Sequence, residues 1–230
     1  MRLSLSIIAV LLLATQAVPQ SYSHKYESFF GKEDRIGIYS QAANERLPST
    51  ILRTIQDNTL LMDCGSSGKP STAFVAKTKD GSKIISAAHN LTMAETKELD
   101  CKLSKTVLPR GLAVSHFKDD GTRADAAYDI AYWPNITSQL GFDICNDVTL
   151  TSKYILVQSL DGSGRLGLSP ECKVKSVEGN LITTTCRGHY KASGAPLLTV
   201  KGQSVCVAGV FNAHSGKLFG YESYAARLSP

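Results

Sequence analysis

The sequence predicts an all-β protein built from two barrels, and three observations lead to this prediction. Short runs of β-branched and aliphatic residues with alternating polarity recur along the chain, and glycine-containing turns separate them. Hydrophobic residues make up 43% and charged residues 20% of the chain, which is ordinary for a globular protein. Short strands at this spacing are typical of a sandwich or barrel, and because 230 residues exceed the needs of one small barrel, we expect two.

The expected strands share this alternation and lie beside turn sequences. They are Ser71–Val75, Lys83–Ser86, Tyr154–Gln158, Lys173–Val177, Leu181–Thr185, Leu197–Val200 and Ser204–Val210. The turns between them are Lys79–Ser82, Asp161–Gly164, Glu178–Asn180 and Lys201–Gln203. Helical patterning is confined to Met93–Leu103 and to a short C-terminal helix over Tyr221–Pro230.

The chain begins with the pattern of a secretory signal. Arg2 supplies a positive charge, Ile7–Leu13 is an uninterrupted apolar run, and Thr15–Ala17 forms a small-x-small cleavage site. The apolar run is shorter than the roughly 20 residues of a membrane helix, and no later segment approaches that length. We therefore expect residues 1–17 to be removed, residues 18–31 to form an arm or pro-segment, and the mature protein to be secreted without a membrane anchor.

Charge and motifs argue against several other classes. The 25 basic and 20 acidic residues give a formal net charge of +5, and the basic ones are scattered along the chain. We therefore expect no nucleic-acid partner. No dinucleotide loop, P-loop, HExxH or EF-hand pattern occurs, so nothing in the sequence indicates a metal or a cofactor. Two glycosylation sequons begin at Asn90 and Asn135, and we take the Asn90 match as chance.

The six cysteines are expected to form three disulfides. They include no C-x-x-C pair of the kind that binds zinc, and an exported chain meets an oxidising compartment. Spacing alone does not fix the connectivity, and free buried thiols are the alternative. We expect Cys64–Cys101, Cys145–Cys206 and Cys172–Cys186. The last pair closes a short loop between two strand-like runs, worth about 3 kcal/mol in the chain-entropy description.

Ser193 lies in a segment that suits a reactive side chain. It is followed by Gly194, Ala195 and Pro196, directly before the apolar strand Leu197–Val200. Small residues on a tight turn let backbone N–H groups face a reacting carbonyl oxygen, as an oxyanion hole requires. The alternative interpretation is a turn without a nucleophile.

Two further residues complete a candidate constellation. His89 follows a β run that ends in two alanines, and these small residues allow the ring to pack close to the backbone with one nitrogen able to take a proton. Asp129 precedes the apolar residues Ile130 and Ala131, where a buried carboxylate can fix the imidazole tautomer. The alternatives are a histidine satisfied at a strand end and an ordinary turn aspartate.

The order His, Asp, Ser along the chain is that of the chymotrypsin type of triad. With Ser71–Val75, Ile84–His89, Asp129–Ala131 and Ser193–Leu197 in place, the sequence resembles the trypsin/chymotrypsin superfamily. It is most similar to the bacterial branch that includes the glutamyl endopeptidases, because Gly31–Arg35 resembles the segment that opens their mature chains. The resemblance runs from Gly31 to the C-terminus.

This resemblance implies two packed six-stranded antiparallel β-barrels, over residues 32–145 and 146–230, with the triad in the cleft between them. Ser193 would attack a peptide carbonyl, His89 would accept its proton and pass it to the leaving amine, and Asp129 would hold the ring. The reaction would proceed through an acyl-enzyme and needs no cofactor.

The backbone N–H groups of Ser193 and Lys191 would form the oxyanion hole. The family has glycine where this chain has Lys191, and a positive φ there would strain a lysine by about 1 kcal/mol or more. Ala192 stands where trypsin-like animal enzymes carry an aspartate that pairs with the freed N-terminal amine, so that ion pair is not available to this chain.

The substrate pocket is expected beside Arg187, His189 and His214, which flank the nucleophile segment and the strand Ser204–Val210. Cationic groups there would favour an acidic residue before the scissile bond. Phe211 stands where the glutamyl-type enzymes have their pocket histidine, and the alternative is that these are surface histidines.

The sequence thus predicts a secreted, monomeric serine endopeptidase that acts on protein or peptide substrates. The alternative is a non-catalytic peptide- or protein-binding protein on the same scaffold, in which Lys191 leaves the oxyanion hole misformed. A small disulfide-stapled structural protein would explain the cysteines but not the three segments around His89, Asp129 and Ser193.

Overall fold

The structure is a computed structural model that describes residues 34–64, 71–92, 101–103, 106–108, 126–137, 139–160, 164–189, 192–214 and 223–229. The expected signal over residues 1–17 and the arm over residues 18–31 lie outside these residues, as does Lys191.

The strands of the C-terminal half form a closed antiparallel ring. The ring consists of β9 (Lys153–Leu160), β11 (Cys172–Glu178), β12 (Leu181–Thr184), β15 (Ser223–Arg227), β14 (Ser204–His214) and β13 (Pro196–Lys201). It runs in that order and closes where β13 pairs with β9. Three short strands are added to it: β10 (Arg165–Leu168) beside β9, β1 (Ile36–Gly37) beside β10, and β8 (Asp143–Ile144) parallel to β14.

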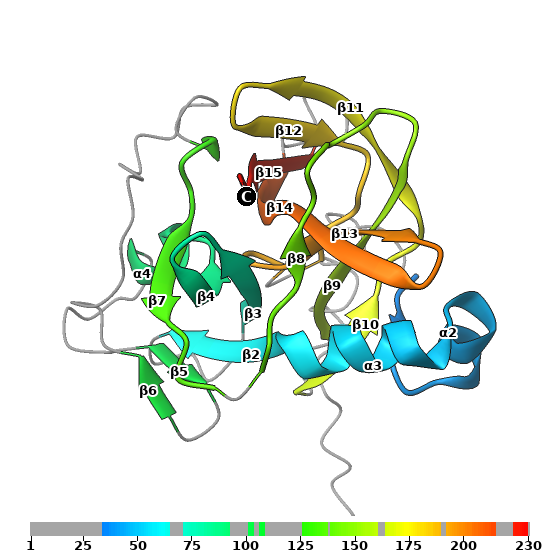
Figure 1. Cartoon of the computed structure of the whole chain (residues 1–230), viewed down its shortest axis with the longest axis horizontal. Coiled ribbons are helices and arrows are strands. Elements are labelled where there is room, and N and C mark those ends of the chain that lie inside the picture. The colour runs from blue at the N-terminus through cyan, green and yellow to red at the C-terminus, as the bar shows by residue number, and fades with distance from the viewer. Residues whose placement is uncertain are drawn as a thin grey trace, which may run out of the picture. The chain divides into compact units, whose positions relative to one another are not determined.

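The strands of the N-terminal half form a second antiparallel sheet, six-stranded, in the order β6-β5-β2-β3-β4-β7. These strands are β6 (Thr106–Leu108), β5 (Cys101–Leu103), β2 (Thr59–Cys64), β3 (Ser71–Thr78), β4 (Gly81–Ser86) and β7 (Ala131–Pro134). Figure 1 shows this sheet in cyan to green and the C-terminal ring in green to red. The expectation of two six-stranded antiparallel barrels is confirmed, and each strand expected from the sequence falls on a strand of the structure.

The two barrels pack through one shared apolar cluster. It joins Phe74 and Ile85 of the N-terminal sheet to Leu198 and Val210 of the C-terminal ring. Phe74 also meets Phe142, with the ring centroids 6.3 Å apart, and both rings are fully buried. Burial of large apolar side chains is the main favourable term in folding, so this cluster holds the barrels against each other and sets the place of any site between them.

Two helices near the start of the described chain correct the sequence analysis, which expected none there. Helix α2 (Gln41–Arg46) is capped by Ser40, whose hydroxyl accepts a hydrogen bond from the Ala43 N–H at 3.2 Å. Helix α3 (Ser49–Asn58) runs into β2 (Figure 1) and buries Ile51, Leu52 and Ile55. Their spacing puts them on one helix face, but β-branched residues within the segment obscure the helical pattern.

The expected C-terminal helix is wrong. The segment forms strand β15, which pairs with β12 from Leu181↔Ala226 to Thr184↔Ser223 and with β14 on its other side. Ala225 and Ala226 favour a helix by intrinsic propensity, but both are fully buried between two neighbouring strands, and this packing overrides the local preference. The other expected helix lies largely outside the described residues, and its end, Cys101–Leu103, is strand β5.

Disulfides join Cys64 to Cys101, Cys145 to Cys206 and Cys172 to Cys186, the three pairs expected from the sequence. One lies in the N-terminal sheet, where Cys64 and Cys101 are register partners, and one ties β14 to the chain after β8. Three disulfides indicate an oxidising, extracytoplasmic compartment. Within the described residues no helix is long and apolar enough to cross a membrane.

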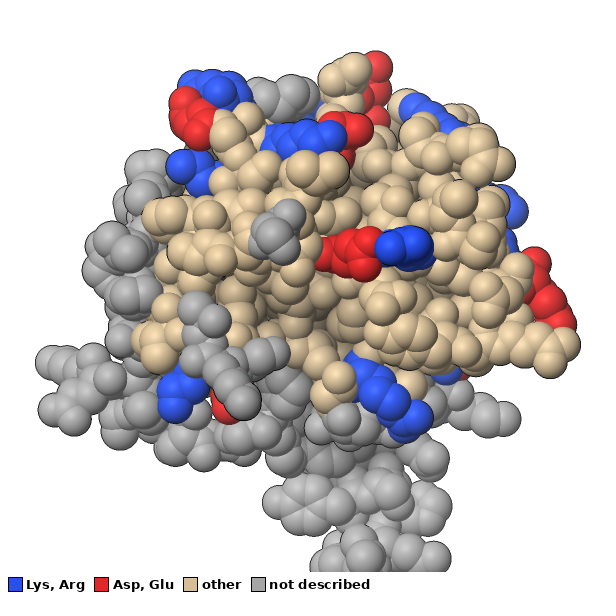
Figure 2. Space-filling view, turned by 60° about the horizontal axis from the view of Figure 1, so that its bottom comes forward, with Lys and Arg blue, Asp and Glu red and all other residues tan. Residues whose placement is uncertain are grey.

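The charges on the face seen in Figure 2 are mixed. Acidic and basic side chains of the described residues alternate there with uncharged ones, and on this face they do not gather into a patch of one sign. Among the described residues, Lys77 and Asp143 form an ion pair at the surface, with Nζ and Oδ1 2.8 Å apart.

Candidate active site

Neighbouring strands bring His89 and Asp129 together. Strands β4 and β7 pair with Ser86 opposite Ala131, so the chain after β4 and the chain before β7 run side by side. His89 then begins the short helix α4 (His89–Thr92), and the Asp129 carboxylate reaches it. The pairing register of β4 and β7 therefore places the two residues next to each other.

The Asp129 carboxylate holds His89 at two points. Its Oδ1 accepts the His89 backbone N–H at 2.8 Å, and its Oδ2 lies 2.6 Å from the ring Nδ1. Asp129 is 3% and His89 9% exposed, so the pair is nearly shielded from water. A carboxylate accepts and does not donate, so Nδ1 carries the proton and Nε2 is the acceptor nitrogen of the neutral ring.

Ser193 lies on a tight turn that leads into β13. Gly194 adopts a φ of +85° there, and its N–H donates to the Phe211 carbonyl at 2.8 Å. The Ala195 N–H donates back to the Ala192 carbonyl at 2.9 Å, which closes the turn around the serine. The Ser193 side chain is half-buried, with its hydroxyl 3.5 Å from the Asn212 carbonyl.

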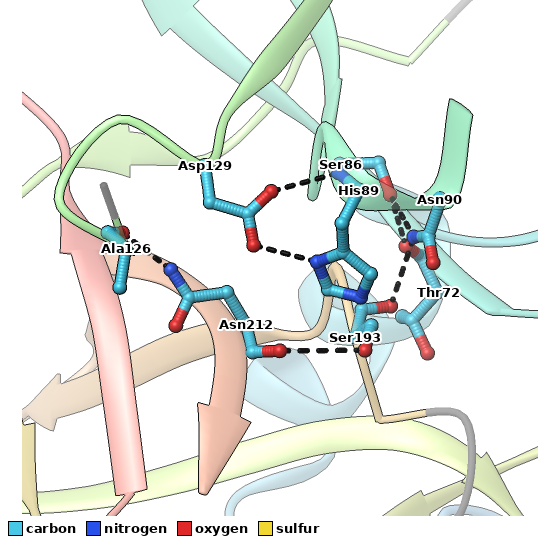
Figure 3. A network of polar contacts seen from close by, with 8 residues as sticks. All are labelled: Thr72, Ser86, His89, Asn90, Ala126, Asp129, Ser193 and Asn212. Atoms are coloured by element: carbon cyan, nitrogen blue, oxygen red, sulfur yellow. Dashed lines mark hydrogen bonds and ion pairs between the residues drawn. The ribbon is translucent and has the colours of Figure 1, made fainter. Parts of the chain in front are cut away.

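Residues of the N-terminal barrel bind this turn through hydrogen bonds to the Ser193 carbonyl. That oxygen accepts the Thr72 N–H at 3.2 Å and lies 3.5 Å from Nδ2 of Asn90. The same Asn90 amide donates to the Ser86 hydroxyl at 3.2 Å, and Ser86 donates to the Thr72 carbonyl at 2.8 Å. In Figure 3 the His89 ring is hydrogen-bonded to Asp129 on one side and points toward Ser193 on the other.

The structure thus brings together His89, Asp129 and Ser193, the three residues that the sequence singled out. It adds residues that the sequence analysis missed: Thr72, Ser86, Asn90 and Asn212. The sequence indicates Asn90 only as the start of a sequon, whereas in the structure its amide donates to the Ser86 hydroxyl. Asn212 is 4% exposed and its Nδ2 donates to the Ala126 carbonyl, a contact across 86 residues that leaves no local signal.

The residues expected at the substrate pocket differ in their surroundings. His189 is buried, and its Nε2 lies 3.3 Å from Oδ1 of Asp34. Arg187 is largely exposed, with its Nη1 4.0 Å from Oδ2 of Asp34. His214 is the last residue of β14, and of its side chain nothing is described. Phe211 is 2% exposed and packs so close to Gly188 that a Cβ there would lie 2.2 Å from its ring.

Comparison with known proteins finds likeness in structure alone. No protein-family model matches the chain, and no curated protein matches it in sequence. Among crystal structures, the inactive form of the Rv3671c protease of M. tuberculosis H37Rv is similar, with 12% identity and a TM-score of 0.52 over 77% of this chain and 86% of that one.

Two other solved structures are also similar to this chain in fold. The serine protease domain of the Sesbania mosaic virus polyprotein has 13% identity and a TM-score of 0.50 over 73% of this chain and 87% of that one. The MamO protease domain from Magnetospirillum magneticum has 15% identity and a TM-score of 0.51 over 76% and 93%. The chain has the chymotrypsin-like fold of serine proteases.

The contacts around the serine turn leave no room for a side chain at Gly194. A Cβ at Gly194 would lie 2.0 Å from the Thr72 carbonyl oxygen and 2.2 Å from the Ser86 hydroxyl, in addition to the strain of its positive φ. Gly202 shares a positive φ, of +61°, but has nothing within 4 Å of its Cβ position. We expect Gly202→Ala to cost about 1–2 kcal/mol of unfolding free energy through strain alone, and Gly194→Ala to cost clearly more. Guanidinium unfolding of both variants measures the difference, and equal costs would contradict the packing argument.

Proposed function

We propose that the protein is a secreted serine endopeptidase in which Ser193, His89 and Asp129 form the catalytic triad. The observation that carries the proposal is the two-point hold of His89 by a buried carboxylate, with the ring turned toward Ser193 (Figure 3). A histidine that only serves the fold has no need of a fixed tautomer beside a half-buried serine on a tight turn. The disulfides fit an extracytoplasmic site of action, and the expected signal segment fits export to the periplasm or to the extracellular medium.

The proposed reaction follows from the protons that the geometry can move. Ser193 Oγ attacks the peptide carbonyl carbon while its proton passes to His89 Nε2, and Asp129 stabilises the imidazolium. The tetrahedral intermediate collapses as His89 gives that proton to the leaving amine, which leaves an acyl ester on Ser193. Water then attacks the ester, with His89 again the base, and the acid product leaves with the serine restored.

The oxyanion would be bound by the backbone N–H groups of Ser193 and Lys191. Within residues 192–195, the N–H groups of Ala192, Gly194 and Ala195 donate to carbonyls of the chain, so the Ser193 N–H is the one available to a substrate oxygen. The proposal for Lys191 rests on the family resemblance, because this residue is outside the described part of the chain.

The substrate class within peptides is a separate question. We retain as a hypothesis that Arg187, His189 and His214 favour an acidic residue before the scissile bond, as in the glutamyl endopeptidases. The alternative from the sequence, surface histidines, does not fit His189, which is buried and contacts Asp34, so at that position a role in the fold competes with the pocket hypothesis.

A peptide library separates these two interpretations. Cleavage mainly after Glu or Asp, weakened when Arg187 is replaced by Gln, supports the cationic pocket. Cleavage mainly after Lys, Arg or large apolar residues rejects it. The Gln isostere of each acidic peptide is the matched substrate, because it keeps the shape and removes the charge.

The triad itself is tested by the reactivity of Ser193. We expect a fluorophosphonate to add one equivalent to the parent protein and to Ser204→Ala, and none to Ser193→Ala, as measured by intact mass. Ser204 is the matched control because it is an exposed serine whose hydroxyl donates to the Lys201 carbonyl. Casein hydrolysis should follow the labelling. A folded parent that takes no label would favour the non-catalytic peptide-binding alternative.

Asp129→Asn tests the role of the carboxylate separately. The two Asp129 oxygens accept from the His89 backbone N–H and from Nδ1, whereas the amide has only one oxygen. With that oxygen on the backbone N–H, the NH₂ group donates to Nδ1 and the ring proton moves to Nε2, so we expect kcat to fall by about 10⁴ with little change in KM. The measurement is steady-state hydrolysis of a peptide amide together with the unfolding midpoint. A fall of less than tenfold in a folded variant would show that Asp129 does not orient a catalytic base.

A further inference from the structure

We propose that Asp34 is a positioning residue for Ser193: its carboxylate holds His189, whose carbonyl accepts the N–H of Ala192, the residue directly before Ser193. The effects on reaction rate that this proposal predicts rest on the proposed hydrolytic function. The juxtaposition spans 155 residues of sequence, with His189 Nε2 3.3 Å from Asp34 Oδ1.

Asp34 lies two residues before β1, in a segment that the C-terminal barrel holds in place. The Arg35 guanidinium donates to the Ser159 carbonyl, and β1 pairs with β10 through Ile36↔Leu168 and Gly37↔Gly167. The Ile38 N–H adds a further bond to the Leu166 carbonyl at 3.1 Å. The chain after Asp34 is thus bound as an additional strand of the C-terminal barrel, and a strand so held can deliver a side chain to a fixed place.

His189 is held on three sides. Its backbone N–H donates to Oε1 of the fully buried Gln158 at 2.9 Å, its ring faces Asp34, and its carbonyl accepts the Ala192 N–H at 2.9 Å. Only 7% of its side chain is exposed. Ala192 directly precedes Ser193, so a shift of His189 is passed to the nucleophile through one hydrogen bond and one peptide unit.

The charges favour the same arrangement. The other Asp34 oxygen lies 4.0 Å from Arg187 Nη1, and Gln158 Nε2 lies 3.4 Å from the Arg187 carbonyl. Asp34 and Gln158 therefore hold both ends of the segment from Arg187 to His189, one through charge and one through neutral hydrogen bonds. Charge-assisted hydrogen bonds are the stronger kind, and this one joins a carboxylate that is about one-third exposed to a buried ring.

The position of this contact gives it a kinetic effect. A misplacement of about 1 Å at a reacting group can cost on the order of 100-fold in rate, whereas binding of the substrate through other contacts is little affected. Loss of the Asp34 carboxylate should therefore lower kcat more than it raises KM. A contact that only stabilised the fold would lower the unfolding midpoint and leave kcat of the folded protein unchanged.

The experiment compares Asp34→Asn, Asp34→Glu, His189→Gln and the double variant Asp34→Asn/His189→Gln in the full chain, with Asp143→Asn as control. Asp143 is also an acid in an ion pair, with Lys77. It pairs with Cys206 near the start of β14, whereas Gly188, next to His189, packs against Phe211 nearer the end of that strand. We expect kcat and the maximal rate of fluorophosphonate labelling to fall about 10- to 100-fold in Asp34→Asn, with KM changed less than about threefold. Asp34→Glu should recover most of the rate, and the double variant should be no slower than the slower single variant.

An Asp34→Asn variant that is folded and keeps the parental kcat overturns the proposal, as does a double variant whose losses multiply. If the parent protein takes no fluorophosphonate, the proposed function fails. Hydrogen exchange then tests separately whether the contact between Asp34 and His189 holds the chain before Ser193. Amides in the peptide from Arg187 to Ala195 should exchange faster in Asp34→Asn than in the parent and in Asp143→Asn, and unchanged exchange overturns it. If Asp34→Asn does not fold, failure of Asp34→Glu to restore both folding and exchange protection also counts against it.

Discussion

The hydrogen bond from the Thr72 N–H to the Ser193 carbonyl is the contact on which the rest of the site depends. It joins β3 of the N-terminal barrel to the serine turn of the C-terminal barrel, beside the apolar cluster that packs the two barrels together. Apolar packing is not directional, so this bond sets the relative position of His89 and Ser193 together with two further polar contacts, from Asn90 to the Ser193 carbonyl and from Asn212 to the Ala126 carbonyl. Gly194 is required next to this contact because any Cβ would enter the space of the Thr72 carbonyl.

How far the sequence predicts this fold depends on whether the signal is local. The strands of both barrels were predictable because β-branched alternation and glycine turns act within a few residues. Helix α3 was missed because its β-branched residues give a strand-like composition to a helical face. The segment Ser223–Arg227 was predicted as a helix because alanine favours one locally, whereas its pairing with β12 and β14 is a property of the folded barrel.

The residues of the candidate site also fall into those with a local sequence signal and those without one. His89, Asp129 and Ser193 could be selected because each lies in a distinctive local segment and their order matches a known triad. Thr72 could not, because it acts through its backbone N–H, and any residue except proline offers that group. Asn90 and Asn212 act through contacts made across long stretches of chain, for which one sequence holds no record.

Two carboxylate–histidine pairs flank the serine turn, and they differ in what they hold. Asp129 binds both the backbone and the ring of His89, so it fixes the direction in which the ring can accept a proton. Asp34 binds the ring of His189, whose backbone is already tied to Gln158 and Ala192, so it fixes the path of the chain. A triad needs both kinds of precision, because a correctly oriented base transfers no proton to a hydroxyl that lies in the wrong place. In the proposed mechanism the first pair would orient the base and the second would hold the nucleophile in place, so removal of either acid is expected to lower kcat rather than substrate binding.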